Sequence, residues 1–140
     1  MSLYLDTSVL VALLTPDEFT GRSEQFRSDS ENSLVVSDFA AAEFASVVSR
    51  RVRTRITSRE NARSALADFD AWLTGVNLRP QIDPADVARA DIYLRRLDLP
   101  LRAPDAIHIA IAQRLGATLV TFDRAMTTAA RALDVTVAEV

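Results

Sequence analysis

Short apolar segments alternate with helix-length segments along the whole chain, and this alternation restricts the fold more than any other feature of the sequence. The apolar segments are only three to five residues long, a length typical of strands buried on both faces of a sheet. They are Leu3–Leu5, Leu34–Val36, Leu78–Ile82, Thr118–Phe122 and Val135–Val137. Strands that alternate with helices form mostly parallel sheets covered by helices on both faces. We therefore predict an α/β fold with three layers, α/β/α, around a central sheet of about five short strands.

The segments between these strands space their apolar residues at helical intervals and carry helix start and stop signals. Ser37 can cap one helix, and Thr57 with Glu60 matches a capping box at the start of another. Gly116 suits the left-handed residue that ends a helix. The predicted helices lie at 9–14, 17–32, 37–55, 57–75, 83–97, 104–115 and 123–133.

The chain length and the apolar pattern indicate a single domain spanning 1–140. Polar residues interrupt every apolar run well before the roughly 20 residues that a membrane-spanning helix needs. The first residues reach Asp6 without a positive charge, unlike a secretory signal, and the chain has no cysteine. We therefore expect a soluble, cytoplasmic protein without a membrane span.

The residue types that the chain lacks exclude several kinds of catalytic site. All 16 basic residues are arginines, so a Schiff-base lysine and the lysine of a phosphate-binding loop are impossible. The absence of cysteine excludes thiolate chemistry, and the single histidine, His108, cannot build a multi-histidine zinc site. The 19 acidic residues remain, and sites made only of oxygen ligands favour ions such as Mg²⁺ or Mn²⁺.

Four acidic residues lie at positions where an ordinary surface role explains them poorly as a group. Asp6 and Asp123 each follow a predicted buried strand, at the edge of a parallel sheet where ligands bind. Asp105 opens a strongly apolar helix, and Glu43 interrupts a run of small and apolar residues. Taken singly, each aspartate also fits a helix start or a turn. Together they would repel one another unless they shared a divalent cation, so the set predicts a metal site.

Four segments around these acids carry a resemblance to a known family. They are Tyr4–Leu13, Ala41–Val48, Pro104–Ala112 and Leu119–Arg124. In this order and spacing they resemble the motifs of PIN-domain proteins, and among these the VapC-type toxins of toxin–antitoxin pairs. The resemblance extends over essentially the whole chain and includes all four acidic positions.

The resemblance implies an endoribonuclease that depends on Mg²⁺, or on Mn²⁺ as a substitute, with Asp6, Glu43, Asp105 and Asp123 as its metal-binding and catalytic residues. It also implies an RNA substrate, a cognate VapB-like antitoxin and a homodimer. Thr7 and Thr121 match hydroxyl positions that support the carboxylates or orient the substrate. Helix capping by Thr7 and strand preference of Thr121 explain these residues equally well.

Other features leave alternatives open. Arg50, Arg51, Arg53 and Arg55 could contact RNA or a partner, or simply form a solvated helix end. His108 lies between isoleucines, which favours a packed, hydrogen-bonded histidine over a catalytic one. A housekeeping PIN nuclease in RNA processing and a noncatalytic interaction module are the alternative functions. A phosphatase of the haloacid-dehalogenase type is disfavoured, because Ser8 stands where its second aspartate is needed and lysine is absent.

Overall fold

Three parallel strands form the centre of the computed structural model, which describes residues 1–27 and 31–140. They are β1 (Ser2–Leu5), β2 (Ser33–Val35) and β3 (Thr118–Val120), in the order β2-β1-β3. Leu3 pairs with Leu34 on one side and with Thr118 on the other. Because β1 is central, the segments that follow β1 and β3 leave the same edge of the sheet side by side.

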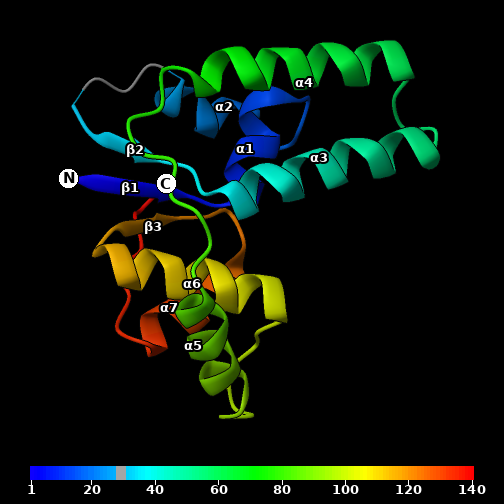
Figure 1. Ribbon diagram of the computed structural model, residues 1–140. Helices are drawn as coiled ribbons and strands as arrows, with labels where there is room; N and C mark the ends of the chain where they lie inside the picture. The colour runs from blue at the N-terminus through cyan, green and yellow to red at the C-terminus, as the bar shows by residue number, and fades with distance from the viewer. Residues whose placement is uncertain (28–30) are drawn as a thin grey trace.

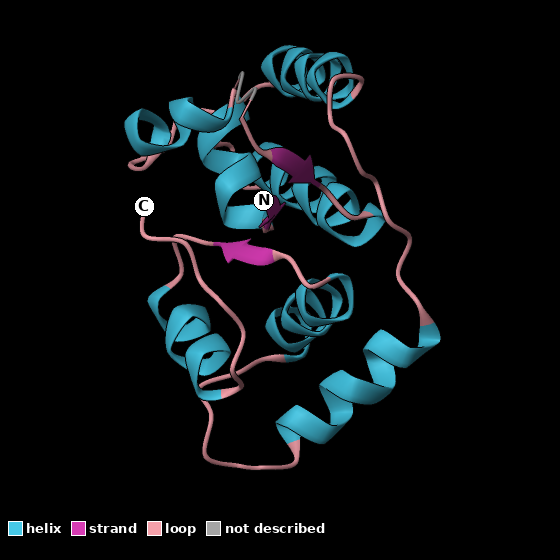
Figure 2. Ribbon diagram, turned by 90° about the vertical axis from the view of Figure 1, so that its left-hand side faces the viewer, coloured by secondary structure: helices cyan, strands magenta, loops and turns pink. Residues whose placement is uncertain are grey.

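Helices cover both faces of this sheet, as Figure 1 and the turned view in Figure 2 show. The first layer contains α1 (Thr7–Leu14), α2 (Thr20–Ser23), the 3-10 helix η1 (Glu24–Phe26), α3 (Asp38–Arg53) and α4 (Arg59–Leu73). The second contains α5 (Pro84–Leu94), α6 (Ala103–Leu115) and α7 (Arg124–Ala132). Within the described ranges, no helix is both long and apolar enough to cross a membrane. The expected α/β/α architecture is confirmed.

The alternation of side chains along β1 divides the core between the two faces. Leu3 and Leu5 pack into the cluster beneath α1, α3 and α4, whereas Tyr4 packs into the cluster beneath α6 and α7. The same division separates Leu34 from Val35 in β2. All of these side chains are buried, which explains why the strands contain continuous apolar residues.

The predicted number of strands was too high. The segment expected at 78–82 is reduced to one bridge between Leu78 and Val35, and the segment at 135–137 to one bridge between Val137 and Leu119. Pro80 cannot donate a backbone hydrogen bond, so it interrupts the pairing of the segment 78–82 with β2. Three strands therefore form, flanked by a single parallel bridge on each side.

Two helix predictions also need correction. The helix expected over 17–32 is only the short pair α2 and η1, which ends at Phe26, and positions 28–30 of that prediction lie outside the described residues. The described residues of the expected helix that follow η1, Arg27, Glu31 and Asn32, are all polar and add no apolar face. The helix expected from Thr57 begins instead after Ser58, whose hydroxyl accepts from the Asn61 amide. The left-handed cap at Gly116 is confirmed, with φ of 61°.

Candidate active site

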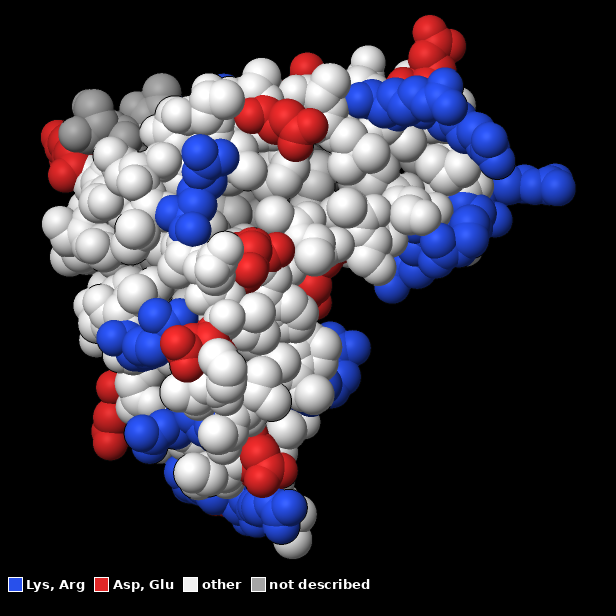
Figure 3. All heavy atoms as spheres, viewed as in Figure 1, with Lys and Arg blue, Asp and Glu red and all other residues white. Residues whose placement is uncertain are grey.

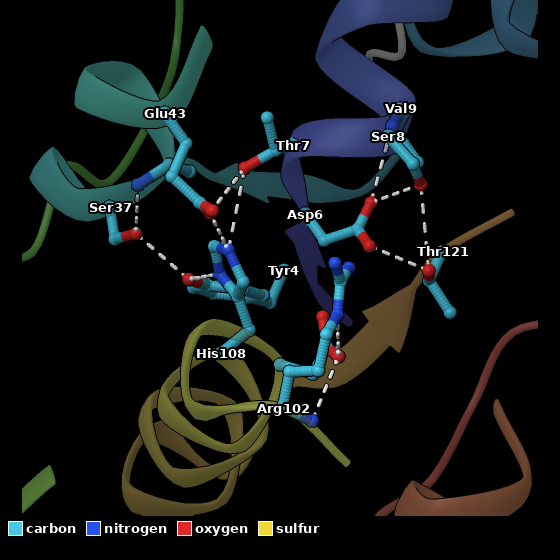
Figure 4. Close-up of polar contacts among 12 residues, drawn as sticks. Tyr4, Asp6, Thr7, Ser8, Val9, Ser37, Glu43, Arg102, His108 and Thr121 are labelled. Carbon is cyan, nitrogen blue, oxygen red and sulfur yellow. Dashed lines mark hydrogen bonds and ion pairs between the residues drawn. The ribbon is translucent and has the colours of Figure 1, made fainter. Parts of the chain in front are cut away.

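A pocket of about 450 Å³ lies at the edge of the sheet where β1 and β3 end, and all four predicted acids line it. Asp6 follows β1, Glu43 lies on α3, Asp105 lies in the first turn of α6, and Asp123 precedes α7. Four separate segments of the chain, drawn from both helical layers, thus contribute one carboxylate each. We call this pocket the acid pocket, and Figure 4 shows the polar contacts of Asp6 and Glu43 within it.

The carboxylate of Asp6 is the most buried of the four. Its side chain is 2% exposed and caps α1 by accepting a hydrogen bond from the Val9 amide. The hydroxyls of Ser8 and Thr121 each donate a hydrogen bond to this carboxylate, both at a distance of 2.6 Å. Burial raises the pKa of Asp6 above its usual range, although these donors and the nearby imidazole act in the opposite direction. A bound cation would offset this cost of burying a charge.

The hydroxyl of Thr121 connects the ends of β1 and β3. It donates to Asp6 and accepts from the backbone amide of Asp123 at 3.0 Å. Ser8 makes a parallel connection, because its hydroxyl donates to Asp6 and accepts from the Phe122 amide at 3.0 Å. These two hydroxyls therefore fix the position of the chain around Asp123 relative to Asp6.

Glu43 is held from the side of α1 and α6. The Thr7 hydroxyl donates a hydrogen bond to the Glu43 carboxylate at a distance of 2.7 Å, and Nε2 of His108 contacts the same oxygen. Burial alone would raise the pKa of Glu43, but the hydrogen bond of His108, its charge when protonated and the Thr7 hydroxyl together hold that pKa below its usual value. Glu43 is therefore ionised at neutral pH and acts as an acceptor.

The other two carboxylates make helix-start contacts. Asp105 is 8% exposed, accepts from the Arg102 amide at 3.3 Å and pairs with the Arg102 guanidinium at 3.5 Å. Asp123 caps α7 by accepting from the Met126 amide at 3.0 Å. Both conventional explanations of these aspartates are thus correct locally, and both side chains nevertheless line the acid pocket.

The acid pocket fits a divalent cation in donor type and in charge. The four carboxylates offer only oxygen atoms as metal ligands, and the carboxylate of Asp6 is deeply buried. Among the residues that the structure describes, however, no three acidic or histidine side chains lie close enough together to bind one metal ion directly. Glu43 is turned toward Thr7, and Asp105 toward Arg102. Because Mg²⁺ keeps several of its waters, carboxylates spaced in this way can hold it partly through water.

Arginines form part of the same walls. Arg50, Arg51 and Arg102 line the acid pocket together with the carboxylates. The side chain of Arg51 contacts Thr15 at 2.9 Å and Asp17 at 3.8 Å. The side chain of Arg50 is exposed and makes no hydrogen bond or ion pair within 1–27 and 31–140. Arg53 and Arg55 lie outside the pocket, near the turn between α3 and α4 where positive charge gathers in Figure 3.

Stacked aromatic rings connect two segments at the rim. Phe19, which lines the acid pocket, stacks on Phe122 with ring centroids 4.9 Å apart. The guanidinium carbon of Arg22 lies 5.4 Å and 5.0 Å from the two centroids. This contact fastens the loop after α1 to the segment that carries Asp123.

Sequence reasoning underestimated two residues of the site. Ser8 supports Asp6, and a polar residue on the otherwise apolar α1 was the available signal. His108 is packed and hydrogen-bonded as expected, but its partners include Glu43 of the acid pocket. The signal here was its position three residues after Asp105, one turn along the same helix.

Comparisons with known proteins identify similar sequences and similar folds. Ribonuclease VapC3 of Pyrobaculum aerophilum is 26% identical over 124 residues, covering 89% of this chain and 91% of that protein. The crystal structure of Mycobacterium tuberculosis VapC20, a toxin that cleaves the sarcin–ricin loop, has a TM-score of 0.71 at 19% identity over 91% of this chain and 94% of that one. Rickettsia felis VapBC2, bound to DNA from its promoter, gives 0.69 at 20% identity over 99% and 98%. The sequence profile of the PIN domain matches residues 3–132, and the chain therefore belongs to the PIN domain family.

Proposed function

We propose that this protein is a metal-dependent endoribonuclease and the toxin of a type II toxin–antitoxin pair. The observation that carries the proposal is the acid pocket, in which four segments distant in sequence each present a carboxylate at the edge of a parallel sheet. Membership of the PIN domain family and the similarity to a ribonuclease of the VapC type support the same activity.

In this proposal Asp6, Glu43, Asp105 and Asp123 hold Mg²⁺, or Mn²⁺ in its place, directly or through water. A bound ion of this kind supplies an activated water and neutralises charge on the attacked phosphate. Thr121 keeps the Asp6 carboxylate fixed in the pocket, and Thr7 does the same for Glu43. The side chains are thus oriented before the substrate arrives, so little reorganisation remains for the reaction step.

The substrate is RNA, whose phosphates carry the negative charge that the arginines of the pocket can bind. Arg50 lies on α3 two turns after Glu43, and both side chains line the acid pocket. A phosphate bound by Arg50 would therefore lie about 10 Å along the helix from the carboxylate, a distance that suits a flanking phosphate better than the scissile one.

The proposed partner is a VapB-like antitoxin. VapBC2 of Rickettsia felis is similar in fold, and its structure includes promoter DNA. An inhibitor of the acid pocket must cover it or displace its cation, and an inserted cationic side chain would do both by pairing with the carboxylates. The homodimer, which the resemblance to VapC-type toxins implies, belongs to the same proposal. So does the cytoplasmic location, which the lack of cysteine and of a secretory signal favours.

Cleavage of a mixed pool of structured RNAs by the purified chain tests the function. We expect cuts in Mg²⁺ or Mn²⁺ that disappear in EDTA and in Asp123→Asn, which removes a carboxylate but keeps a good helix cap. Asp98→Asn, an exposed acid outside the pocket, should cut normally. Cleavage that persists in EDTA would contradict the mechanism. A folded, metal-binding chain that cuts no RNA would favour the noncatalytic module.

Arg50→Ala should weaken RNA binding with little change in kcat. The loss of one charge-assisted contact of about 1–1.5 kcal/mol raises KM roughly 5- to 10-fold. The slope of log affinity against log salt should fall by about one. Arg53→Ala is the matched control, because Arg53 lies on the same helix but outside the pocket and should leave both quantities unchanged. If both substitutions weaken RNA binding equally, the overall positive charge of the helix binds RNA, and Arg50 makes no specific contact.

A further inference from the structure

The only histidine of the chain is completely engaged beside the acid pocket. His108 is 2% exposed, and each of its ring nitrogens has a polar partner. Nδ1 lies 2.7 Å from the hydroxyl of Tyr4, and Nε2 contacts the carboxylate of Glu43. The imidazole also stacks on Phe39, with ring centroids 5.1 Å apart. A ring held from three sides in this way has a fixed orientation.

The partners of His108 determine which nitrogen carries the proton. The Glu43 oxygen that Nε2 contacts also accepts from the Thr7 hydroxyl, and a carboxylate has only acceptors to offer, so Nε2 must donate to it. In the neutral ring Nδ1 is then the acceptor, and the Tyr4 hydroxyl must donate to it. Burial raises the pKa of Tyr4 far above its usual value, so this hydroxyl keeps its proton.

The contacts of Ser37 are consistent with a Tyr4 hydroxyl that donates to His108. Ser37 caps α3, its hydroxyl oxygen accepting from the Ala40 amide at 3.0 Å. Its own proton is therefore available for the oxygen of Tyr4, 2.8 Å away. The bonds run from Ser37 to Tyr4, to His108 and to Glu43, and so return to the helix on which they began (Figure 4).

We propose that His108 is a positioning residue, held by Tyr4 with its proton on Nε2, which fixes the Glu43 carboxylate in the orientation that the acid pocket needs for its cation. The expected effect on catalysis rests on the function proposed above. The proton arrangement rests on contacts alone and can be tested without any reaction. Hydrogen-bond partners that orient a metal ligand change metal affinity or activity by about 10- to 100-fold.

The first test is the ¹⁵N spectrum of the imidazole in the untagged, metal-free chain at about pH 8. Since the chain has one histidine, the imidazole signals belong to His108, and their couplings to the two carbon-bound ring protons distinguish Nδ1 from Nε2. We expect a protonated Nε2 and an unprotonated Nδ1. In Tyr4→Phe, which removes the donor to Nδ1, the two tautomers should mix. A spectrum of the wild-type chain with the proton on Nδ1 overturns the proposal.

The second test compares two amides that imitate different ring nitrogens. The nitrogen of His108→Gln lies as many bonds from Cα as Nε2 and can still donate to Glu43. The amide of His108→Asn is one bond shorter and lies at the level of Nδ1, where its oxygen can accept from Tyr4 but its nitrogen cannot reach Glu43. We expect Mn²⁺ affinity, measured by electron paramagnetic resonance, to fall 10- to 100-fold in His108→Asn. His108→Gln should recover most of that loss, at similar thermal stability.

Cleavage measured on the same samples separates the two proposals. A fall in kcat that follows the fall in Mn²⁺ affinity, with KM for RNA unchanged, supports a positioning role. Equal Mn²⁺ affinity in the two variants overturns that role even if the wild-type chain cleaves RNA. If the wild-type chain cuts nothing, the proposed function fails, while the spectrum and the Mn²⁺ affinities still decide the part played by His108.

Discussion

Asp6→Asn is expected to abolish RNA cleavage while making the metal-free protein more stable. The loss should reach about 1,000-fold, because metal-assisted catalysis supplies several kcal/mol and each 1.4 kcal/mol is tenfold in rate. The gain arises because the buried amide carries no charge to desolvate. Its oxygen can accept from Ser8 and Val9 as the carboxylate does, and its amino group can donate to the Thr121 hydroxyl in place of the bond that Asp6 accepts from it. A rise in Tm of a few degrees corresponds to about 1 kcal/mol in a domain of this size.

The difference in stability between Asp6→Asn and the wild-type chain should increase with pH. The pKa of Asp6 is raised in the folded state, so the stability linked to its protonation is present at low pH and is lost as the pH rises through that pKa. Only the wild-type chain suffers this loss. Melting curves in EDTA should therefore differ most at neutral and alkaline pH and approach each other on acidification.

Two results would contradict the account of Asp6. An Asp6→Asn chain that melts below the wild type in EDTA would mean that the carboxylate stabilises the fold by itself. Saturating Mg²⁺ should stabilise the wild-type chain and leave Asp6→Asn almost unchanged, so equal stabilisation of both would place the ion elsewhere. Asp91→Asn, at an exposed position on α5, is the control for the loss of one negative charge.

Arg114→Met is expected to give the largest loss of stability, although it lies outside the acid pocket. Arg114 of α6 binds the Asp86 carboxylate of α5 through two bonds of 2.8 Å and 2.9 Å, and the Asp86 side chain is 1% exposed. Removing the arginine leaves a buried charge without its partner, which costs about 3–5 kcal/mol. Urea titration should show this loss as a lower midpoint at an unchanged slope.

The second substitution in this pair shows whether the unpaired charge is the cause. Asp86→Asn added to Arg114→Met should restore most of the stability, because the amide still accepts from Asp83. The exposed pair of Arg95 and Asp91 provides the comparison, and Arg95→Ala should cost less than about 1 kcal/mol. A double variant as unstable as Arg114→Met would point instead to lost packing of the arginine stem.

The sequence predicted those parts of the fold whose signal is local. Strand alternation gave the layers, and Ser37, Asp83 and Gly116 marked helix ends that the structure confirms. The edges of the sheet could not be predicted in the same way. Pro80 is a local signal against a full strand at 78–82. At Val137, however, the choice between a strand and a single bridge depends on hydrogen bonds to a neighbouring segment, and a short apolar run contains no information about those partners.

The candidate site shows the same limit. Its four acids could be named only as a group, from their places beside apolar segments and from the family motifs that these segments resemble, and the structure lines one pocket with all of them. Their supporting contacts join residues far apart in the chain, such as Thr121 with Asp6 and His108 with Glu43. Such contacts arise only when β1, β3, α3 and α6 have packed together. Seen alone, Thr121 fits a strand and His108 fits a core.

The residues that line the acid pocket come from 6–19, 43–51 and 102–126, so the described stretch 52–101 contributes none. That stretch forms α4 and α5, one on the outside of each helical layer. Natural variation can therefore alter it freely as long as its inner faces still pack. Substitutions on the exposed faces of α4 and α5 should then leave the acid pocket as it is, so these two helices can diverge among relatives without a change in the chemistry of the pocket.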